Sequence, residues 1–264
     1  MGRHLSTIGF VFESAAEKSE MLSRLATDSR LRLAVEPGDY AVWRSRSGAE
    51  LWFHVVGSRN EDGTLADDGI VGLTSFFDGA SSVGVRIERQ VNRDGDSPFV
   101  GAWAGWIDPE HKCEVSAYPV VFDAVDFAAH ASRPLPMCCT VRLVGFARLL
   151  TVYPDEAAFF AAGSETAGLE PFSFVPVGLA AVAANGSLET ASAPSSHGLI
   201  NGRLVEHELL RNEATGFDIC RMLIASDATV YEVVADPELV TCAMEPGAIV
   251  SAMCWMVGRI TDDN

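Results

Sequence analysis

The sequence contains no apolar run long enough to cross a membrane. None of its hydrophobic stretches approaches the ~18 consecutive apolar residues of a transmembrane helix. The amino-terminal segment, residues 1–7, lacks the apolar region of a secretory signal peptide. Cysteine occurs 6 times without Cys-x-x-Cys spacing, so we expect reduced thiols that pack as small hydrophobic side chains. These absences lead us to expect a cytoplasmic protein without a membrane partner.

Motifs of metal, nucleotide and nucleophile sites are also missing from the sequence. The 6 histidines are dispersed, without a zinc-binding spacing. There is no Gly-x-x-x-x-Gly-Lys-Ser/Thr loop, no Gly-x-Gly-x-x-Gly between a strand and a helix, and no Gly-x-Ser-x-Gly turn. Serine and histidine are neighbours in Ser195–Gly198, but we expect a loop there, which is a poor platform for a nucleophile and its base. We therefore expect no cofactor and no metal, and we assign no catalytic residue.

Positive charge is scarce, above all after residue 150. The chain holds 19 Lys and Arg against 36 Asp and Glu, which gives a net charge of −17. Residues 151–264 contain 4 basic and 16 acidic residues, a balance of −12. An acidic surface repels phosphate groups, so we expect neither nucleic acid nor an anionic membrane as a partner.

Hydrophobic residues are abundant, and most of them stand in short alternating runs. They make up 48% of the 264 residues, enough for a sizeable core. Alternation of apolar and polar residues is typical of β-strands, whereas helical periodicity is rare in this chain. The pattern predicts an α+β, β-rich fold, with a mixed α/β amino-terminal half and an OB-like antiparallel β-barrel in the carboxyl-terminal half.

The prolines of Ser132–Pro136 indicate a boundary between two domains, because proline interrupts both helices and strand ladders. We expect an α+β domain at 1–133, opening with strand, helix, strand and strand and continuing with antiparallel strands. An OB-like barrel with one short helix is expected at 134–264, and loops at 58–69 and 183–196. The sequence leaves open whether the two halves share one continuous sheet. The opening elements are expected at Leu5–Phe12, Ser14–Thr27, Asp39–Arg44 and Ala49–Val56.

One predicted strand combines a carboxylate, an indole and an imidazole. Alternate residues of a strand share a face, so Glu50, Trp52 and His54 are expected together. Trp43 lies in the preceding predicted strand. These four residues are candidates for a ligand pocket. Aromatic residues in strands also build cores and dimer faces, so that alternative stays open.

The opening of the chain combines Leu5-Ser-Thr-Ile-Gly-Phe-Val-Phe12, the helix after it, and Ser47-Gly-Ala-Glu-Leu-Trp52. With these segments it resembles one module of the glyoxalase, or vicinal-oxygen-chelate, superfamily. It implies a metal-binding histidine on the first strand and a carboxylate on the last strand of the module. Glu50 matches the carboxylate, but Thr7 stands where the histidine is expected.

The carboxyl-terminal part is similar to barrel segments of bacterial proteins of unknown function. The resemblance implies an OB-type five-stranded barrel with curved strands, one small helix and glycine at the bends. Many such barrels bind single-stranded nucleic acid through basic faces, which 4 arginines after residue 150 do not provide. The matching features are Gly202–Glu206, Asn212–Gly216, Val234–Glu238, Pro246–Val250 and Trp255–Arg259.

Two functions are compatible with these observations. The first is a non-catalytic, self-associating protein of structural or binding character, a homodimer that binds a small ligand or another protein. The alternative is a glyoxalase-like enzyme that acts on a small polar metabolite, with or without a divalent metal, in a pocket around Glu50, His54, Trp43 and Trp52. Stoichiometric bound metal would favour the enzyme.

Overall fold

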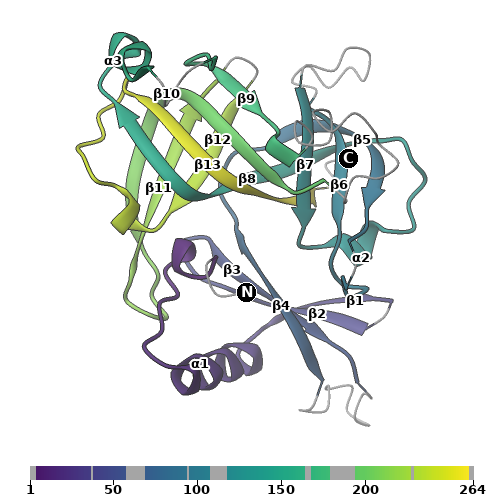
Figure 1. The fold of residues 1–264 in the computed structure, drawn as a ribbon. Coiled ribbons are helices and arrows are strands. Elements are labelled where there is room, and N and C mark those ends of the chain that lie inside the picture. The colour runs from purple at the N-terminus through teal and green to yellow at the C-terminus, as the bar shows by residue number, and fades with distance from the viewer. Residues whose placement is uncertain are drawn as a thin grey trace.

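Two β-sheets and a few helices form the protein (Figure 1). A computed structural model describes residues 4–36, 38–57, 69–93, 95–107, 118–163, 168–178, 194–226 and 229–261. A sheet of four strands, the small sheet, has the order β1-β2-β3-β4. A sheet of nine strands, the large sheet, has the order β11-β12-β8-β5-β6-β7-β13-β10-β9. The chain is therefore β-rich with few helices, as expected for its α+β class.

The helical segments are short except for α1. They are η1 (Ser6–Ile8), α1 (Ala15–Thr27), α2 (Phe127–His130), α3 (Glu156–Ala161) and η3 (Pro237–Leu239). The small sheet consists of β1 (Leu31–Val35), β2 (Gly38–Arg44), β3 (Ala49–Val55) and β4 (Ile70–Phe77). The large sheet consists of β5 (Val83–Val91), β6 (Ala102–Ile107), β7 (Tyr118–Ala124), β8 (Met137–Tyr153), β9 (Ser173–Val175), β10 (His197–Arg211), β11 (Asp218–Ala225), β12 (Val230–Ala235) and β13 (Ile249–Thr261).

Helix α1 begins at the residue that the sequence predicts. The Ser14 hydroxyl accepts a hydrogen bond from the Glu17 backbone N–H at 3.1 Å, and the Glu17 carboxylate accepts one from the Glu13 N–H at 2.8 Å. These contacts satisfy N–H groups that the first helical turn leaves without a partner. The helix ends at Thr27, as predicted.

The opening strand predicted at Leu5–Phe12 is wrong, because this segment contains the 3-10 helix η1 and no strand. Its carbonyl groups find partners outside a sheet. The Asn212 side-chain amide donates to the Ile8 carbonyl at 2.9 Å, and the Thr215 hydroxyl donates to the Gly9 carbonyl at 2.6 Å. A turn more than 200 residues away in the chain therefore fixes this segment, a contact that local sequence does not reveal.

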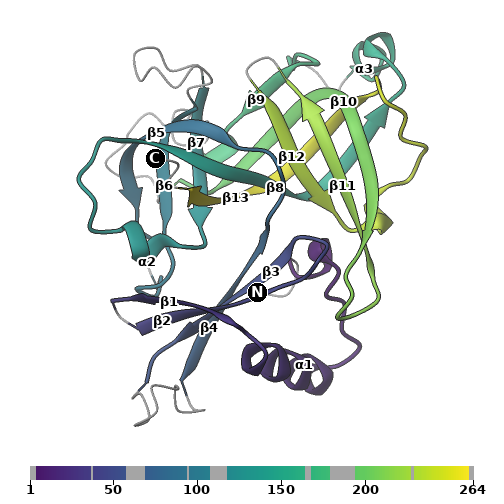
Figure 2. The same ribbon diagram turned by 180° about the vertical axis from the view of Figure 1, so that it is seen from behind.

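The small sheet lies between α1 and the large sheet (Figures 1 and 2). Residues paired directly across antiparallel strands share a face, so the pair Tyr40↔His54 lies on one side and Ala41↔Phe53 on the other. Tyr40 donates its hydroxyl proton to the Phe99 carbonyl, at 2.6 Å, in the connection between β5 and β6 of the large sheet. Every residue of β3 is buried, because α1 lies on one side of the small sheet and the large sheet lies on the other (Figures 1 and 2).

Strands β8 and β13 form the centre of the large sheet. They pair antiparallel from Ile249↔Tyr153 to Thr261↔Thr140. The pairings β8–β5–β6–β7–β13 and β8–β12–β11–β10–β13 each lead from one of these two strands back to the other. Strands from both sides of the expected boundary at 133/134 therefore belong to one continuous sheet, although the boundary itself stays a prediction.

The OB-like antiparallel barrel predicted at 134–264 is not confirmed. Strand β12 runs parallel to β8, and β7 runs parallel to β13. In addition, β8 and β13 also pair with strands from the amino-terminal half. Alternation identifies strands but carries no information on which strand lies beside which, and the barrel expectation depended on that order.

One hydrophobic core spans both sheets. Val144 and Phe146 of β8 and Val257 of β13 pack in the same cluster as Tyr40 and Trp52 of the small sheet. This shared core fixes the small sheet against the large one.

Several further expectations concern single segments. Cys138 is disulfide-bonded, so the expectation of reduced thiols is wrong for this residue, whereas Cys220, Cys242 and Cys254 carry free thiols. The loops expected at 58–69 and 183–196 lie outside the described residues, apart from 69 and 194–196.

Among the helices that the structure describes, none has the length and apolar character needed to cross a membrane.

Candidate functional site

Glu50 is fully buried at the contact between the two sheets. Its carboxylate accepts hydrogen bonds from Arg44 of β2, from Trp52 at 2.8 Å and from Arg259 of β13 at 3.2 Å. Burial raises the pKa of Glu50, while the charges of Arg259 and Arg44 and the Trp52 hydrogen bond lower it. The two carboxylate oxygens therefore already hold cationic and N–H donors.

Asp78, directly after β4, extends this arrangement. It accepts hydrogen bonds from Arg142 of β8 and from Arg259, the latter at 2.6 Å, and its other oxygen lies 3.5 Å from Arg44. We call Glu50, Asp78, Arg44, Arg142 and Arg259 the Glu50 network. Its three guanidinium groups outnumber its two carboxylates, which is a poor environment for a metal cation. No group of three or more His, Cys, Asp or Glu side chains within the described ranges is arranged to hold a metal ion.

His54 is buried against aromatic rings and does not touch Glu50 through any observed hydrogen bond. Its ring stacks on Phe99 with a centroid distance of 5.1 Å, and its Nε2 lies 3.0 Å from the Thr74 hydroxyl. Burial lowers the pKa of His54 to about 4, so the ring is neutral near pH 7.

The four residues proposed as a pocket lie on two sides of the small sheet. Glu50, Trp52 and His54 share a face, as predicted. Trp43 pairs with Leu51 and therefore points to the opposite face. There it lines a separate cavity of about 940 Å³. The structure brings three of the four candidates together, but as packed and hydrogen-bonded core residues.

A different cavity, of about 700 Å³, runs along β4, and we call it the β4 cleft. Six consecutive residues of β4, 70–75, line it. Because alternate side chains of a strand point to opposite faces, a cavity lined by consecutive residues follows the edge of the strand. Strand β4 is the outermost strand of the small sheet, and within the described part of the chain it pairs with β3 alone.

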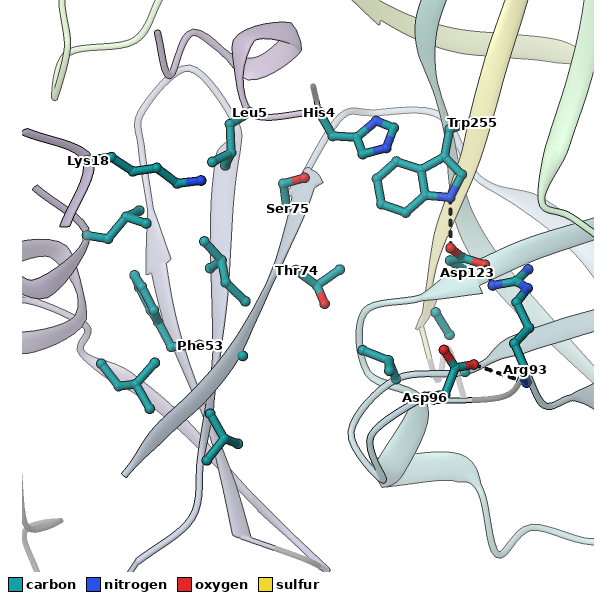
Figure 3. A pocket seen from close by; sticks show the side chains of 18 of the residues that line it. His4, Leu5, Lys18, Phe53, Thr74, Ser75, Arg93, Asp96, Asp123 and Trp255 are labelled. Atoms are coloured by element: carbon teal, nitrogen blue, oxygen red, sulfur yellow. Dashed lines mark hydrogen bonds and ion pairs between the residues drawn. The ribbon is translucent and has the colours of Figure 1, made fainter. Parts of the chain in front are cut away.

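Two walls flank this edge. On one side α1 contributes Lys18 and Leu22. On the other side lie Val100, from the β5–β6 connection, and Trp255 of β13. Figure 3 shows His4, Trp255, Asp123, Arg93 and Asp96 along one wall, with Thr74 and Ser75 of β4 facing them.

Asp123, near the end of β7, organises the polar wall of the β4 cleft. Its carboxylate accepts hydrogen bonds from Arg93 and from the Trp255 indole, both at 2.8 Å, and from the Ser196 hydroxyl. Arg93 also donates to the Ser196 hydroxyl, at 2.8 Å. The Ser196 side chain is thus buried and held by a carboxylate and a guanidinium, which does not make it a nucleophile with a histidine base.

Two histidines and an arginine lie beside this wall. The His4 ring lies 4.0 Å from the Trp255 ring, and His197 Nε2 lies 2.8 Å from Arg148 Nη1. Burial and the Arg148 charge lower the pKa of His4 to about 4 and also lower the pKa of His197. Both rings are consequently neutral near pH 7, and Arg148 carries the positive charge.

Sequence analysis missed the β4 cleft because its parts are far apart in the chain. Ser195–Gly198 was expected in a loop, whereas His197 begins β10 and Ser196 is buried. Arg93 lies in the turn after β5, where nothing in the local sequence indicates a contact with Asp123. The sequence offered one indirect signal of a polar site, namely charged residues that neighbour a strand containing tryptophan.

The β4 cleft is lined by apolar, polar and charged side chains. It combines apolar walls, the unpaired edge of β4 and the hydrogen-bonded Arg93–Asp123 pair, and Lys18 adds a cation from α1. No protein-family description, curated protein or solved structure matches this chain, so its site stands on its own geometry.

Proposed function

We propose that the protein is a non-catalytic binding protein that holds an extended peptide segment in the β4 cleft. The observation that carries the proposal is the position of β4: an edge strand whose unpaired side opens onto a cavity of about 700 Å³. An edge strand presents a row of free N–H and C=O groups, and an extended peptide satisfies them by adding a strand.

The walls of the cleft suit such a ligand. Alternate side chains of an added strand point in opposite directions, toward α1 on one side and toward Val100 and Trp255 on the other. Leu22 and Leu73 offer apolar contacts, and Lys18 offers a cation, near the α1 side. Backbone pairing would supply affinity and these side chains would supply selectivity.

The rival function, a glyoxalase-like enzyme acting on a small polar metabolite, lacks a suitable donor set. A metal ligand at Glu50 would have to replace the Arg44, Arg259 and Trp52 hydrogen bonds. His54 Nε2 is engaged with Thr74, and the ring is buried against Phe99. These residues do not fit the metal that the family resemblance implies.

Other properties of the proposed binding protein remain expectations. We propose a homodimer, and we expect no nucleic-acid partner because the chain carries a net charge of −17. A cytoplasmic location was expected from the sequence. The disulfide at Cys138 counts against that location, because disulfides persist mainly in oxidising compartments.

A peptide-display experiment tests the proposed function. Panning a random nonapeptide library against the intact protein should enrich sequences with alternating apolar residues, and their affinity is then measured by fluorescence polarisation. Val100→Trp fills the cleft and should weaken binding at least tenfold. Val205→Trp makes the same change at a half-exposed position of β10 and should leave affinity unchanged.

Three outcomes would contradict the proposal. The first is a library without enriched peptides. The second is a set of enriched peptides that bind the Val100→Trp protein as tightly as the original, which would place their site elsewhere. Binding of free amino acids alone, without any peptide, would indicate a small-molecule site in the same cavity and would also overturn the peptide proposal.

A further inference from the structure

Strand β1 is the second edge of the small sheet, and it is unusually exposed. Its residues are exposed up to Val35, including Leu31 at 51% and Leu33 at 37%. Within the described part of the chain, β1 pairs with β2 alone. An apolar edge strand without proline or an inward-pointing charge is a template for pairing with another strand.

The sequence around β1 is complementary to itself in antiparallel orientation. When Leu33 is placed opposite Leu33 of a second copy, Leu31 faces Val35 and Arg32 faces Ala34. One residue further out, Arg30 faces Glu36. Because a twofold axis repeats every contact, this register creates two Arg–Glu pairs and two Leu–Val pairs.

The local net charge at this edge is small, so it opposes a second copy less than the strongly acidic rest of the chain does. The chain carries −17 overall, so most of its surface repels another copy. Residues 30–36 contain Arg30, Arg32 and Glu36, a net charge of +1. Opposite charges directly across two strands stabilise pairing, whereas like charges oppose it.

We propose that two copies of this chain associate through β1, antiparallel and in register at Leu33, so that the two small sheets form one eight-stranded sheet. This interface is separate from the β4 cleft and does not depend on the peptide proposal. The β4 edge cannot serve in the same way, because α1 on one side and the β5–β6 connection and Trp255 on the other wall it in. The residues of β1 are instead exposed up to Val35, and among the described strands only β2 pairs with it.

Charge reversal tests this register. Sedimentation velocity of the full chain, over about a hundredfold concentration range, should show a reversible monomer–dimer equilibrium, since a short edge contact makes a small interface. Arg30→Glu sets two carboxylates opposite each other at both ends of the paired strands, and Glu36→Arg sets two guanidinium groups there. Each single change should weaken dimerisation about tenfold, by converting two attractive pairs into repulsive ones.

The double variant Arg30→Glu/Glu36→Arg restores opposite charges at both ends and should recover the original dimer affinity. Arg24→Glu, at an exposed position of α1, is the matched control with the same change in net charge as Arg30→Glu and should dimerise normally. Circular dichroism and the thermal midpoint verify that all variants fold.

Each other result overturns the proposal. A monomer at every concentration removes the interface. A dimer unaffected by either single reversal places the interface elsewhere. A double variant that stays as weak as the single ones contradicts the register centred on Leu33.

Discussion

At the scale of single residues, the buried polar groups of β3 differ in the partners that surround them and therefore in the charge that they can carry. Glu50 is surrounded by cations and an indole N–H, so a charged carboxylate has partners in the core. His54 lacks such partners and stays neutral between Tyr40 and Phe99. The same strand face therefore holds one group stabilised by its hydrogen-bond partners and one that is buried only in its uncharged form.

The free energy of unfolding should fall when the pH drops from about 6.5 to about 4, because of His54. Its pKa is about 4 in the folded chain and 6.5 in the reference state, so the unfolded chain binds the proton first. The stabilisation is complete above the unfolded pKa and is lost as pH falls toward the folded pKa. The full loss amounts to roughly 3 kcal/mol.

Urea denaturation at a series of pH values measures this loss. The His54→Gln variant, which keeps an amide near Thr74, should show a shallower decline than the original chain. His207→Gln changes an exposed histidine on β10 and should leave the decline unaltered. An equal decline in all three proteins would contradict the role of His54.

Sequence periodicity predicted correctly which of the candidate residues share a strand face, whereas their role as a ligand pocket stays a prediction. Strand periodicity places Glu50, Trp52 and His54 on one face, and the structure agrees. Periodicity could not show what lies across that face, and Arg259 is more than 200 residues away in the chain. For the same reason Trp43 seemed to belong with these residues, although its pairing with Leu51 turns it away.

At the scale of secondary-structure elements, Arg259 joins β13 to the small sheet. Its guanidinium contacts Glu50 at 3.2 Å and Asp78 at 2.6 Å, and lies 5.2 Å from the centroid of the Phe76 ring. The Glu50 side chain is fully buried. Removing a partner from such a pair leaves an uncompensated charge in the core.

Arg259→Met should therefore lower the free energy of unfolding by about 3–5 kcal/mol, as measured by urea denaturation. Combining it with Glu50→Gln should cost less than the sum of the two single changes, because the two side chains interact directly. Arg203→Met breaks a half-exposed ion pair with Glu156 and should change stability little. Additive losses in the double variant would show that the Glu50–Arg259 contact contributes nothing.

Elements were easier to predict than their boundaries or partners. The strands expected at Asp39–Arg44 and Ala49–Val56 correspond to β2 and β3, and the helix expected at Ser14–Thr27 corresponds to α1. The failures have physical causes. Leu5–Phe12 is apolar because it packs in the core as η1 and irregular chain. Strand β1 was not predicted, and it is a short edge strand whose residues are exposed up to Val35.

At the scale of the whole molecule, the two sheets should unfold together. The core cluster that contains Tyr40 and Trp52 also contains Val144 and Val257 of the large sheet, and the Glu50 network crosses the same contact. Far-UV circular dichroism and tryptophan fluorescence should follow one coincident transition in urea. Two separated transitions would instead support independent domains at 1–133 and 134–264.

The position of β13 in the sheet has a consequence for synthesis of the chain. Strand β13 lies beside β7, β8 and β10, and it carries Arg259 and Trp255 to the small sheet and the β4 cleft. All other described strands precede it in the chain. While the ribosome is still making it, Glu50 and Asp78 lack their shared arginine and β8 lacks its longest neighbour. We therefore expect the nascent protein to complete its core, and to resist proteases, only after β13 has been made.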